Sequence, residues 1–159
     1  MEYTQMPAGL TSARAAVAVA PLATQIQTFP IPKVSDEDAW LKVEACGVCG
    51  TDWEFYERTP WGAKLGPIIL GHEIVGEIVS IGDTAARKWG VAEGSRVAVE
   101  EFLPCGVCSR CRSGNYRLCS QTDSRGDAPF LRYGAVSTQV RPSLWGGFAE
   151  IMYLHPDSV

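Results

Sequence analysis

Residues 71–82 read Gly-His-Glu-Ile-Val-Gly-Glu-Ile-Val-Ser-Ile-Gly, a β-branched run bounded by glycines. Isoleucine and valine favour extended backbone, and glycines at the ends of a run allow tight turns. The same alternation of a short apolar run with a Gly, Pro, Asn or Asp turn recurs along the chain. It predicts strands over residues 15–20, 24–29, 39–45, 73–81, 96–102 and 148–154.

Helix signals are few. The clearest covers residues 51–58, with Thr51 or Asp52 as N-cap. Short strands, many glycines and little helix indicate a mainly β chain, folded as a partly open β-barrel or a sandwich with short helices. No internal repeat, low-complexity tract or linker divides the sequence, so we expect one domain over residues 1–159.

Composition excludes several classes of protein. Of the 159 residues, 46% are hydrophobic and 20% are charged, which rules out disordered, coiled-coil and collagen-like chains. No apolar run approaches the roughly 20 residues that a membrane span requires, so we expect no membrane partner. A net charge of -4 argues against a nucleic-acid partner, because such binders usually carry a basic surface.

The N-terminal region bears on the cellular compartment. Residues 15–23 are apolar and follow Arg14, as in the apolar part of a signal peptide. Glu2, Pro21 and the lack of a small-residue cleavage site favour a strand instead. We therefore expect a cytoplasmic protein with reduced thiols, in which clustered cysteines more often bind metal than form disulfides.

Residues 105–119 contain four of the six cysteines, namely Cys105, Cys108, Cys111 and Cys119. Two-residue gaps let the first three thiolates wrap one ion, and the Gly-Asn pair at residues 114–115 supplies a turn that returns the fourth. Four thiolates make a closed tetrahedral zinc site, which stabilises a fold and does not catalyse. We predict a structural Zn²⁺ in a small lobe at these residues.

Three other assignments of this cysteine cluster are less favoured. An iron–sulfur cluster expects a three-residue last gap before a Cys-Pro pair, whereas here seven residues precede Cys119 and Ser120 follows it. Disulfides require an oxidising compartment. A zinc ribbon on nucleic acid would use Arg110, Arg112 and Arg117, but in an acidic chain we expect these arginines to offset the charge of the thiolates.

A second group of candidate ligands precedes the lobe. Cys46 and Cys49 end a predicted strand, and His72 follows Cys49 by twenty-three residues, within Gly-His-Glu. Taken alone, Cys46 and Cys49 could be redox, metal-binding or core residues, and His72 is more often a histidine with satisfied hydrogen bonds than a metal ligand. Together, a Cys-Gly turn and a Gly-His-Glu turn can present one thiolate and one imidazole to the same ion, and nitrogen and sulfur ligands with an open position suit a catalytic zinc.

Four motifs then occur in a familiar order: Cys49-Gly-Thr-Asp, Gly71-His-Glu-x2-Gly76-x5-Gly82, Gly94-Ser-Arg-Val97 and the four-cysteine lobe. In the identity and order of these four motifs, residues 12–159 resemble the GroES-like catalytic domain of zinc-dependent medium-chain alcohol dehydrogenases. Gly50 and residues 142–148 resemble the sorbitol and threonine dehydrogenase branch.

The resemblance implies roles for individual residues. Cys49 and His72 are similar to the first two catalytic zinc ligands, and Glu73 to the acidic neighbour that coordinates the metal in some members. Thr51 matches the hydroxyl that hydrogen-bonds the reacting alcohol and starts a proton relay. Asp52 resembles the carboxylate that orients the histidine. Cys46 is not a ligand by this comparison, and a small buried thiol is expected there.

The sequence also departs from the family pattern. Many members carry a histidine at the outer end of the relay, where this chain has Glu54. Gly50 stands where some members place a basic residue against the cofactor pyrophosphate. The third zinc ligand and the nucleotide-binding domain are expected beyond Val159, and the 159 residues contain no G-x-G-x-x-G.

The implied activity is oxidation of a small alcohol or polyol, through a zinc-bound alkoxide, by NAD or NADP. By itself the chain is expected to be inactive, and the parent enzyme to be a homo-oligomer. The aromatic residues that follow the cysteine motif, Trp53, Phe55, Tyr56 and Trp61, are candidates for the wall of the substrate pocket. The alternative is a non-catalytic, zinc-stabilised β-module used for interaction or metal binding.

Overall fold

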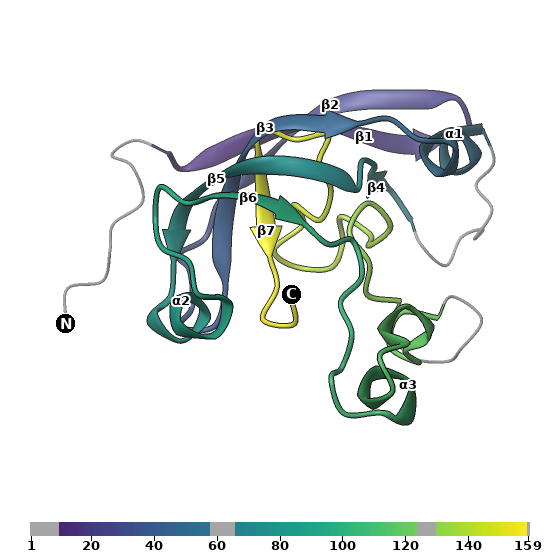
Figure 1. Cartoon of the computed structure of the whole chain (residues 1–159). Coiled ribbons are helices and arrows are strands. Elements are labelled where there is room, and N and C mark those ends of the chain that lie inside the picture. The colour runs from purple at the N-terminus through teal and green to yellow at the C-terminus, as the bar shows by residue number, and fades with distance from the viewer. Residues whose placement is uncertain (1–9, 58–65, 124–129, 159) are drawn as a thin grey trace.

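The computed structural model describes residues 10–57, 66–123 and 130–158, and Figure 1 shows their arrangement. The strands of these residues form two antiparallel sheets. One sheet has the order β2-β1-β4, from β1 (Ser12–Ala20), β2 (Ala23–Pro30) and β4 (Ile68–Ile69). The other has the order β6-β5-β3-β7, from β3 (Ala39–Gly47), β5 (Glu73–Ile81), β6 (Arg96–Val99) and β7 (Ile151–Leu154).

The two sheets are joined by the chain just before β7. Ala149 forms a bridge with Ala15 of β1, and Ala16 N donates to Phe148 O at 2.8 Å. Glu150 N donates to Arg14 O at 3.0 Å, and the two side chains of this pair form an ion pair. The mainly β, partly open barrel that the sequence predicts is therefore confirmed.

Two predicted strands are shorter than expected. The strand predicted over residues 96–102 ends at Val99, because the chain leaves the sheet there and continues toward the four-cysteine lobe. The strand predicted over residues 148–154 begins at Ile151, because the N–H of Glu150 and the carbonyl of Phe148 bond to β1, although Glu150 O still accepts from Val43 N of β3 at 3.1 Å.

Four short helices complete the described structure: α1 (Gly50–Glu57), α2 (Asp83–Trp89), α3 (Ser109–Arg112) and the 3-10 turn η2 (Tyr116–Leu118). The helix predicted near residues 51–58 is confirmed as α1, whereas α2 was not predicted. Its local signals are an acidic residue in the first turn, basic residues in the last, and Gly90 in the left-handed conformation at the C-cap. Within the described ranges no helix is both long and apolar enough to cross a bilayer.

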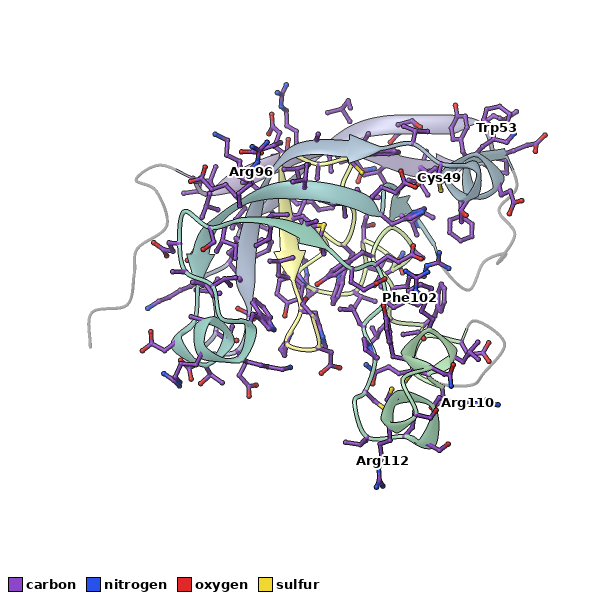
Figure 2. The ribbon with its side chains drawn as sticks, viewed as in Figure 1. Cys49, Trp53, Arg96, Phe102, Arg110 and Arg112 are labelled. Atoms are coloured by element: carbon purple, nitrogen blue, oxygen red, sulfur yellow. The ribbon has the colours of Figure 1, made fainter. Side chains whose placement is uncertain are left out.

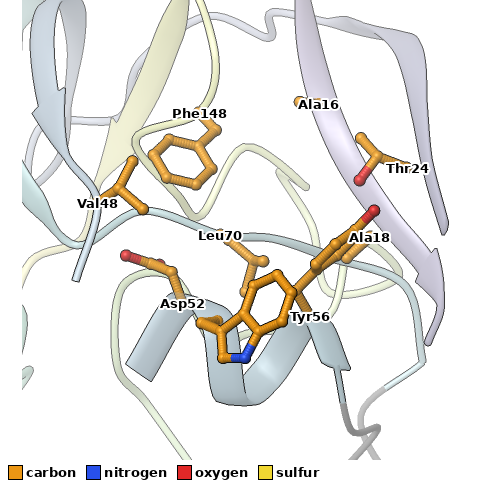
Figure 3. A pocket seen from close by; sticks show the side chains of 9 residues that line it. Ala16, Ala18, Thr24, Val48, Asp52, Tyr56, Leu70 and Phe148 are labelled. Carbon is orange, nitrogen blue, oxygen red and sulfur yellow. The ribbon is translucent and has the colours of Figure 1, made fainter. Parts of the chain in front are cut away.

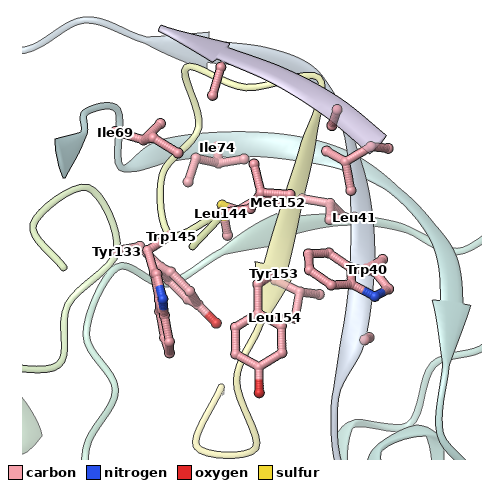
Figure 4. Close-up of a cluster of buried hydrophobic side chains, with 14 of the residues drawn as sticks. Trp40, Leu41, Ile69, Ile74, Tyr133, Leu144, Trp145, Met152, Tyr153 and Leu154 are labelled. Carbon is pink, nitrogen blue, oxygen red and sulfur yellow. The ribbon is translucent and has the colours of Figure 1, made fainter. Parts of the chain in front are cut away.

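The core lies between the sheets and is rich in aromatic residues (Figure 4). All four residues of β7 are buried, and Trp145 packs edge-on against Tyr153 with ring centroids 5.0 Å apart. The indole nitrogens of Trp40 and Trp145 are satisfied at the edge of this core, since Trp40 donates to Pro32 O and Trp145 to Val140 O. Burying each large apolar side chain contributes about 1.5–3 kcal/mol, so this core holds the barrel on which the lobe and the second cysteine site are mounted.

Candidate metal centres

The four cysteines of residues 105–119 converge in a lobe that projects from the barrel, beside α3 in Figure 1. Cys108 Sγ lies 3.5 Å from Cys111 Sγ and 3.9 Å from Cys119 Sγ. Zinc–sulfur bonds of about 2.3 Å place two sulfurs of a tetrahedral site about 3.8 Å apart. The sulfur positions therefore fit one tetrahedral zinc ion.

Backbone amides in the lobe point at the sulfurs. Cys108 N donates to Cys105 Sγ at 3.4 Å, Cys111 N to Cys108 Sγ at 3.5 Å, and Cys105 N to Cys119 Sγ at 3.4 Å. Such bonds favour the thiolate, and the bond from Cys111 N is the main reason that the pKa of the Cys108 thiol is lowered to about 6. The pKa of the Cys105 thiol is lowered as well, whereas burial and the Cys108 sulfur raise the pKa of the Cys111 thiol to about 12, so the amides favour a negative sulfur at Cys105 and Cys108 rather than at every cysteine of the lobe.

The lobe is attached to the barrel by side chains outside the cysteine cluster. Glu100 accepts hydrogen bonds from Tyr116 Oη at 2.8 Å and from Arg117 at 3.3 Å. Gln121 Nε2 donates to Leu103 O and to Asp157 Oδ2, both at 2.8 Å. Arg117 thus pairs with a carboxylate.

Arg110 and Arg112, the other two arginines expected to offset the charge of the thiolates, are exposed to solvent. Arg110 and Arg112 extend from the far end of the lobe into solvent (Figure 2). The backbone N–H groups, rather than these side chains, are the nearest positive partners of the sulfurs.

The second cluster forms where β3 ends and β5 begins. Cys49 follows β3 in the turn before α1, and His72 stands directly before β5, which pairs with β3. This pairing brings Cys49 Sγ to 3.0 Å from His72 Nε2. The predicted thiolate–imidazole pair is therefore assembled by a strand pairing between residues twenty-three positions apart.

Gly71 makes the turn that aims His72. Its φ is +87°, a backbone conformation that favours glycine. A Cβ at this position would lie 2.6 Å from the Phe148 ring and 2.7 Å from Cys46 Sγ. Gly147 N donates to Gly71 O at 2.8 Å, so the same segment that joins the two sheets also holds this turn.

Asp52 connects both halves of the second cluster. Its side chain is 3% exposed, and it accepts hydrogen bonds from Cys49 N at 3.0 Å and from Gly71 N at 2.9 Å. Its Oδ1 lies 3.5 Å from His72 Nδ1. Asp52 therefore occupies one ring nitrogen of His72 and leaves Nε2 to face Cys49.

The pKa values of this pair follow from its geometry. Burial alone would raise the pKa of Asp52, but the interaction with His72 and the two backbone N–H groups outweigh it and lower that pKa. The Asp52 carboxylate raises the pKa of His72 to about 9 against the opposing effect of burial. Cys49, Asp52 and His72 form a group compact enough to surround an ion. Since both Asp52 oxygens already accept amide hydrogens, its position is that of an orienting residue.

The remaining predicted site residues differ in their exposure to solvent. Thr51 is half-buried in the first turn of α1, and Glu54 is exposed on the same helix. Glu73 is exposed, and its carboxylate lies over Gly47 of the neighbouring strand. Cys46 is half-buried beneath Gly71 and Gly147, and burial raises the pKa of its thiol to about 11, as expected of an unreactive packing thiol.

A further carboxylate at this site was missed by the sequence interpretation. Glu101 Oε2 lies 3.6 Å from His72 Nε2 and 2.9 Å from Arg132 Nη2. The local signal was an acidic residue between β6 and Cys105. Its partners are distant in sequence, so no motif contained them.

An apolar cavity of about 240 Å³ adjoins the second cluster (Figure 3). Asp52 and Val48 line the side nearest Cys49, and Trp53 and Tyr56 of α1 line another. Phe55, also expected in a pocket wall, is buried in a small core cluster with Ile68 and Leu70. Trp61 lies outside the described residues.

Comparison with known proteins identifies the fold. Residues 35–159 match the alcohol dehydrogenase GroES-like domain. The chain belongs to this family. The resemblance inferred from the cysteine and Gly-His-Glu motifs is thus confirmed.

Similar members of the GroES-like alcohol dehydrogenase family are longer than this chain. A Mycobacterium tuberculosis protein named "probable alcohol dehydrogenase adh" is 44% identical over 146 residues, which are 92% of this chain and 38% of that protein. L-threonine 3-dehydrogenase of Symbiobacterium thermophilum is 38% identical over 134 residues, covering 80% of this chain and 36% of the enzyme.

A solved structure agrees with these relatives. Acetophenone reductase from Geotrichum candidum, in complex with NAD, superposes with a TM-score of 0.70 at 25% identity, over 96% of this chain and 39% of the reductase. The chain therefore spans about two fifths of the length of the proteins that it matches.

Proposed function

We propose that this chain is the zinc-binding catalytic domain of an NAD(P)-dependent alcohol or polyol dehydrogenase. Cys105, Cys108, Cys111 and Cys119 hold a structural zinc, and Cys49 and His72 hold a catalytic one. The observation that carries the proposal is the 3.0 Å approach of Cys49 Sγ to His72 Nε2, with Asp52 at the other ring nitrogen. A histidine whose second nitrogen is held by a buried carboxylate is the usual arrangement of a zinc ligand.

Each residue of the site has a distinct task in this function. A bound zinc ion supplies a Lewis acid that makes an alcohol hydroxyl easier to deprotonate. Asp52 holds the His72 ring in one orientation, and Cys49 provides the thiolate. Thr51, next to Asp52 on α1, is the hydroxyl that receives or passes on the alcohol proton. Glu54, exposed on the same helix, is the outward end of that proton path.

The cavity beside α1 accounts for the carbon part of the substrate. Its walls are mostly apolar, with Trp53, Tyr56 and Phe148 among them. Asp52 lines both this cavity and the Cys49–His72 cluster, so a small alcohol placed here has its hydroxyl end beside the cluster. The similarity to threonine dehydrogenase favours a substrate with a second polar group next to the hydroxyl.

The hydride acceptor is a nicotinamide cofactor in this proposal. The support is the acetophenone reductase structure, which was solved with NAD. The 159 residues contain no G-x-G-x-x-G, and they cover 38% of the M. tuberculosis relative. We expect the nucleotide to be bound by a separate domain, so that the 159-residue chain alone shows no turnover. Single-domain organisation over 1–159, a cytoplasmic location and a homo-oligomeric parent enzyme remain predictions.

The decisive experiment is zinc content per chain, by elemental analysis of reduced protein purified without chelator. We expect two zinc ions for the wild-type chain, one for Cys49→Ser, and two for the control Cys46→Ser. One zinc ion in the wild-type chain, unchanged by Cys49→Ser, would contradict a catalytic site. That result would support the alternative of a non-catalytic, zinc-stabilised β-module.

A further inference from the structure

Phe102 lies at the junction between the barrel and the four-cysteine lobe (Figure 2). Two guanidinium groups lie over its ring: that of Arg132 at 4.7 Å from the centroid, and that of Arg117, which belongs to the lobe, at 5.2 Å. Each arginine also pairs with one of the two glutamates that precede Phe102. Arg117 Nη2 lies 3.3 Å from Glu100 Oε2. Arg132 Nη2 lies 2.9 Å from Glu101 Oε2. One aromatic ring therefore contacts two ion pairs, one of which belongs to the lobe.

On the barrel side, a single oxygen atom connects the ion pair to His72. Oε2 of Glu101, which pairs with Arg132, also lies 3.6 Å from His72 Nε2. Tyr133 N donates to Glu101 O at 2.8 Å. Phe102 and Arg132 form an antiparallel bridge, so the main chain keeps the pair in register. Since the same oxygen faces the guanidinium and the imidazole, a displacement of Arg132 changes the negative charge that faces Nε2.

On the lobe side, the ion pair is fixed by residues next to a cysteine of the cluster. Tyr116 Oη donates to Glu100 at 2.8 Å, and both Tyr116 and Arg117 belong to η2. This turn ends directly before Cys119, whose N–H donates to Tyr116 O at 2.9 Å. A metal ion orders the segments that carry its ligands, so the position of η2 depends on whether Cys119 is bound to an ion. Filling the lobe therefore fixes the guanidinium of Arg117 over Phe102.

We propose that Phe102 is a positioning residue that couples the four-cysteine lobe to His72. A metal ion in the lobe holds η2 against the ring, and the ring holds Arg132 in its pair with Glu101. This rests on the proposed function, which places zinc in the lobe. Because coupling between two sites is reciprocal, a metal ion at Cys49 and His72 also strengthens zinc binding in the lobe.

Nuclear magnetic resonance of the imidazole nitrogens tests the coupling, because the sequence contains only two histidines. The reduced chain is labelled with ¹⁵N at histidine in a Cys49→Ser background, which keeps added zinc away from His72. Spectra are recorded before and after addition of one equivalent of Zn²⁺, which the four-thiolate lobe takes. The variants are Phe102→Leu, Phe102→Tyr and Arg117→Gln. Arg112→Gln is the matched control, because Arg112 is a lobe arginine that extends into solvent. Circular dichroism and zinc content show that each variant is folded and that its lobe is filled.

Zinc in the lobe is expected to shift the ¹⁵N signals of His72 in the Cys49→Ser chain. The shift should persist in Phe102→Tyr, which keeps the aromatic ring, and in Arg112→Gln. It should largely disappear in Phe102→Leu and Arg117→Gln. When Cys49 is intact and the lobe is filled with zinc, Phe102→Leu should weaken Co²⁺ binding at the second site about two- to fivefold, the value of one exposed cation–π contact.

Equal His72 shifts in folded Phe102→Leu and in the chain with Phe102 would overturn the coupling, as would His72 signals that do not respond when the lobe fills. A zinc-induced His72 shift, in a protein whose Cys49-intact form binds no second metal ion, would keep the coupling and contradict the catalytic site of the proposed function. If the lobe takes no zinc, the proposed function fails and this inference fails with it.

Discussion

Replacing Asp52 by asparagine tests whether the second site is organised by one buried carboxylate. The side chain is 3% exposed and accepts from Cys49 N at 3.0 Å and Gly71 N at 2.9 Å, while facing His72 Nδ1. Asparagine keeps the shape but has one acceptor oxygen, so its amide group must face one of these N–H groups. One buried donor then loses its partner, which costs about 1–3 kcal/mol, and the other bond loses its charge assistance.

We expect Asp52→Asn to lower the free energy of unfolding by about 2–3 kcal/mol. For a chain of this size each kcal/mol corresponds to roughly 2–4 °C, so the melting temperature should fall by roughly 4–12 °C. Zinc content should also fall from two ions toward one, because loss of an orienting partner weakens metal binding about 10–100-fold.

The assay is thermal unfolding followed by circular dichroism, with elemental analysis of the same samples. Asp83→Asn is the matched control, because Asp83 is exposed in the first turn of α2. It should cost only a few tenths of a kcal/mol, about the value of a charge at a helix N-terminus. A melting temperature of Asp52→Asn equal to that of Asp83→Asn, with two zinc ions retained, would refute the role given to Asp52.

Three further predictions concern the turn, the C-terminal core and the lobe. Gly71→Ala should destabilise the chain by about 2–5 kcal/mol in urea unfolding, because it combines an unfavourable φ with overlap on the Phe148 ring, and a cost below 1 kcal/mol would contradict the strained turn. Burial against Trp145 lowers the pKa of His155. The unfolded state therefore binds the proton first, so the His155 contribution to stability is present above about pH 6.5 and is lost as pH falls toward the folded pKa. His155→Gln should remove part of this pH dependence in urea unfolding between pH 7 and 5, and identical slopes would argue against it. Chelation strong enough to empty the lobe at residues 105–119 should expose the lobe to proteolysis while the barrel core stays protected, whereas equal protection with and without metal would contradict a structural zinc.

Much of the fold was readable from local patterns. The β-branched run at residues 73–81 is bounded by glycines and forms β5 over Glu73–Ile81 as predicted. Strand identity depends on side chains that alternate within the run, so it is visible without tertiary contacts. The predicted strands at β6 and β7 have wrong ends, because hydrogen-bond partners from other strands decide where a ladder stops. The two-residue strand β4 was not predicted. The missed helix α2 carried recognisable capping signals at Gly90 and in its charged turns.

The sequence by itself predicted both clusters of candidate metal ligands. Spacing within residues 105–119 is enough to predict the four-cysteine lobe, because ligands a few residues apart can reach one ion through local turns. The Cys49–His72 pair was also predicted, but mainly by resemblance to a family.

The family resemblance had already placed Asp52 beside His72, but only the tertiary structure showed that Glu101 stands there as well and that Glu73 does not. Asp52 is brought there by α1, and Glu101 by the chain leaving β6, with Arg132 holding it from thirty-one residues away. Glu73 is adjacent to His72 in sequence but lies over the neighbouring strand. Adjacency along an extended chain sends neighbouring side chains to opposite faces, whereas strand pairing brings together residues that no local pattern connects.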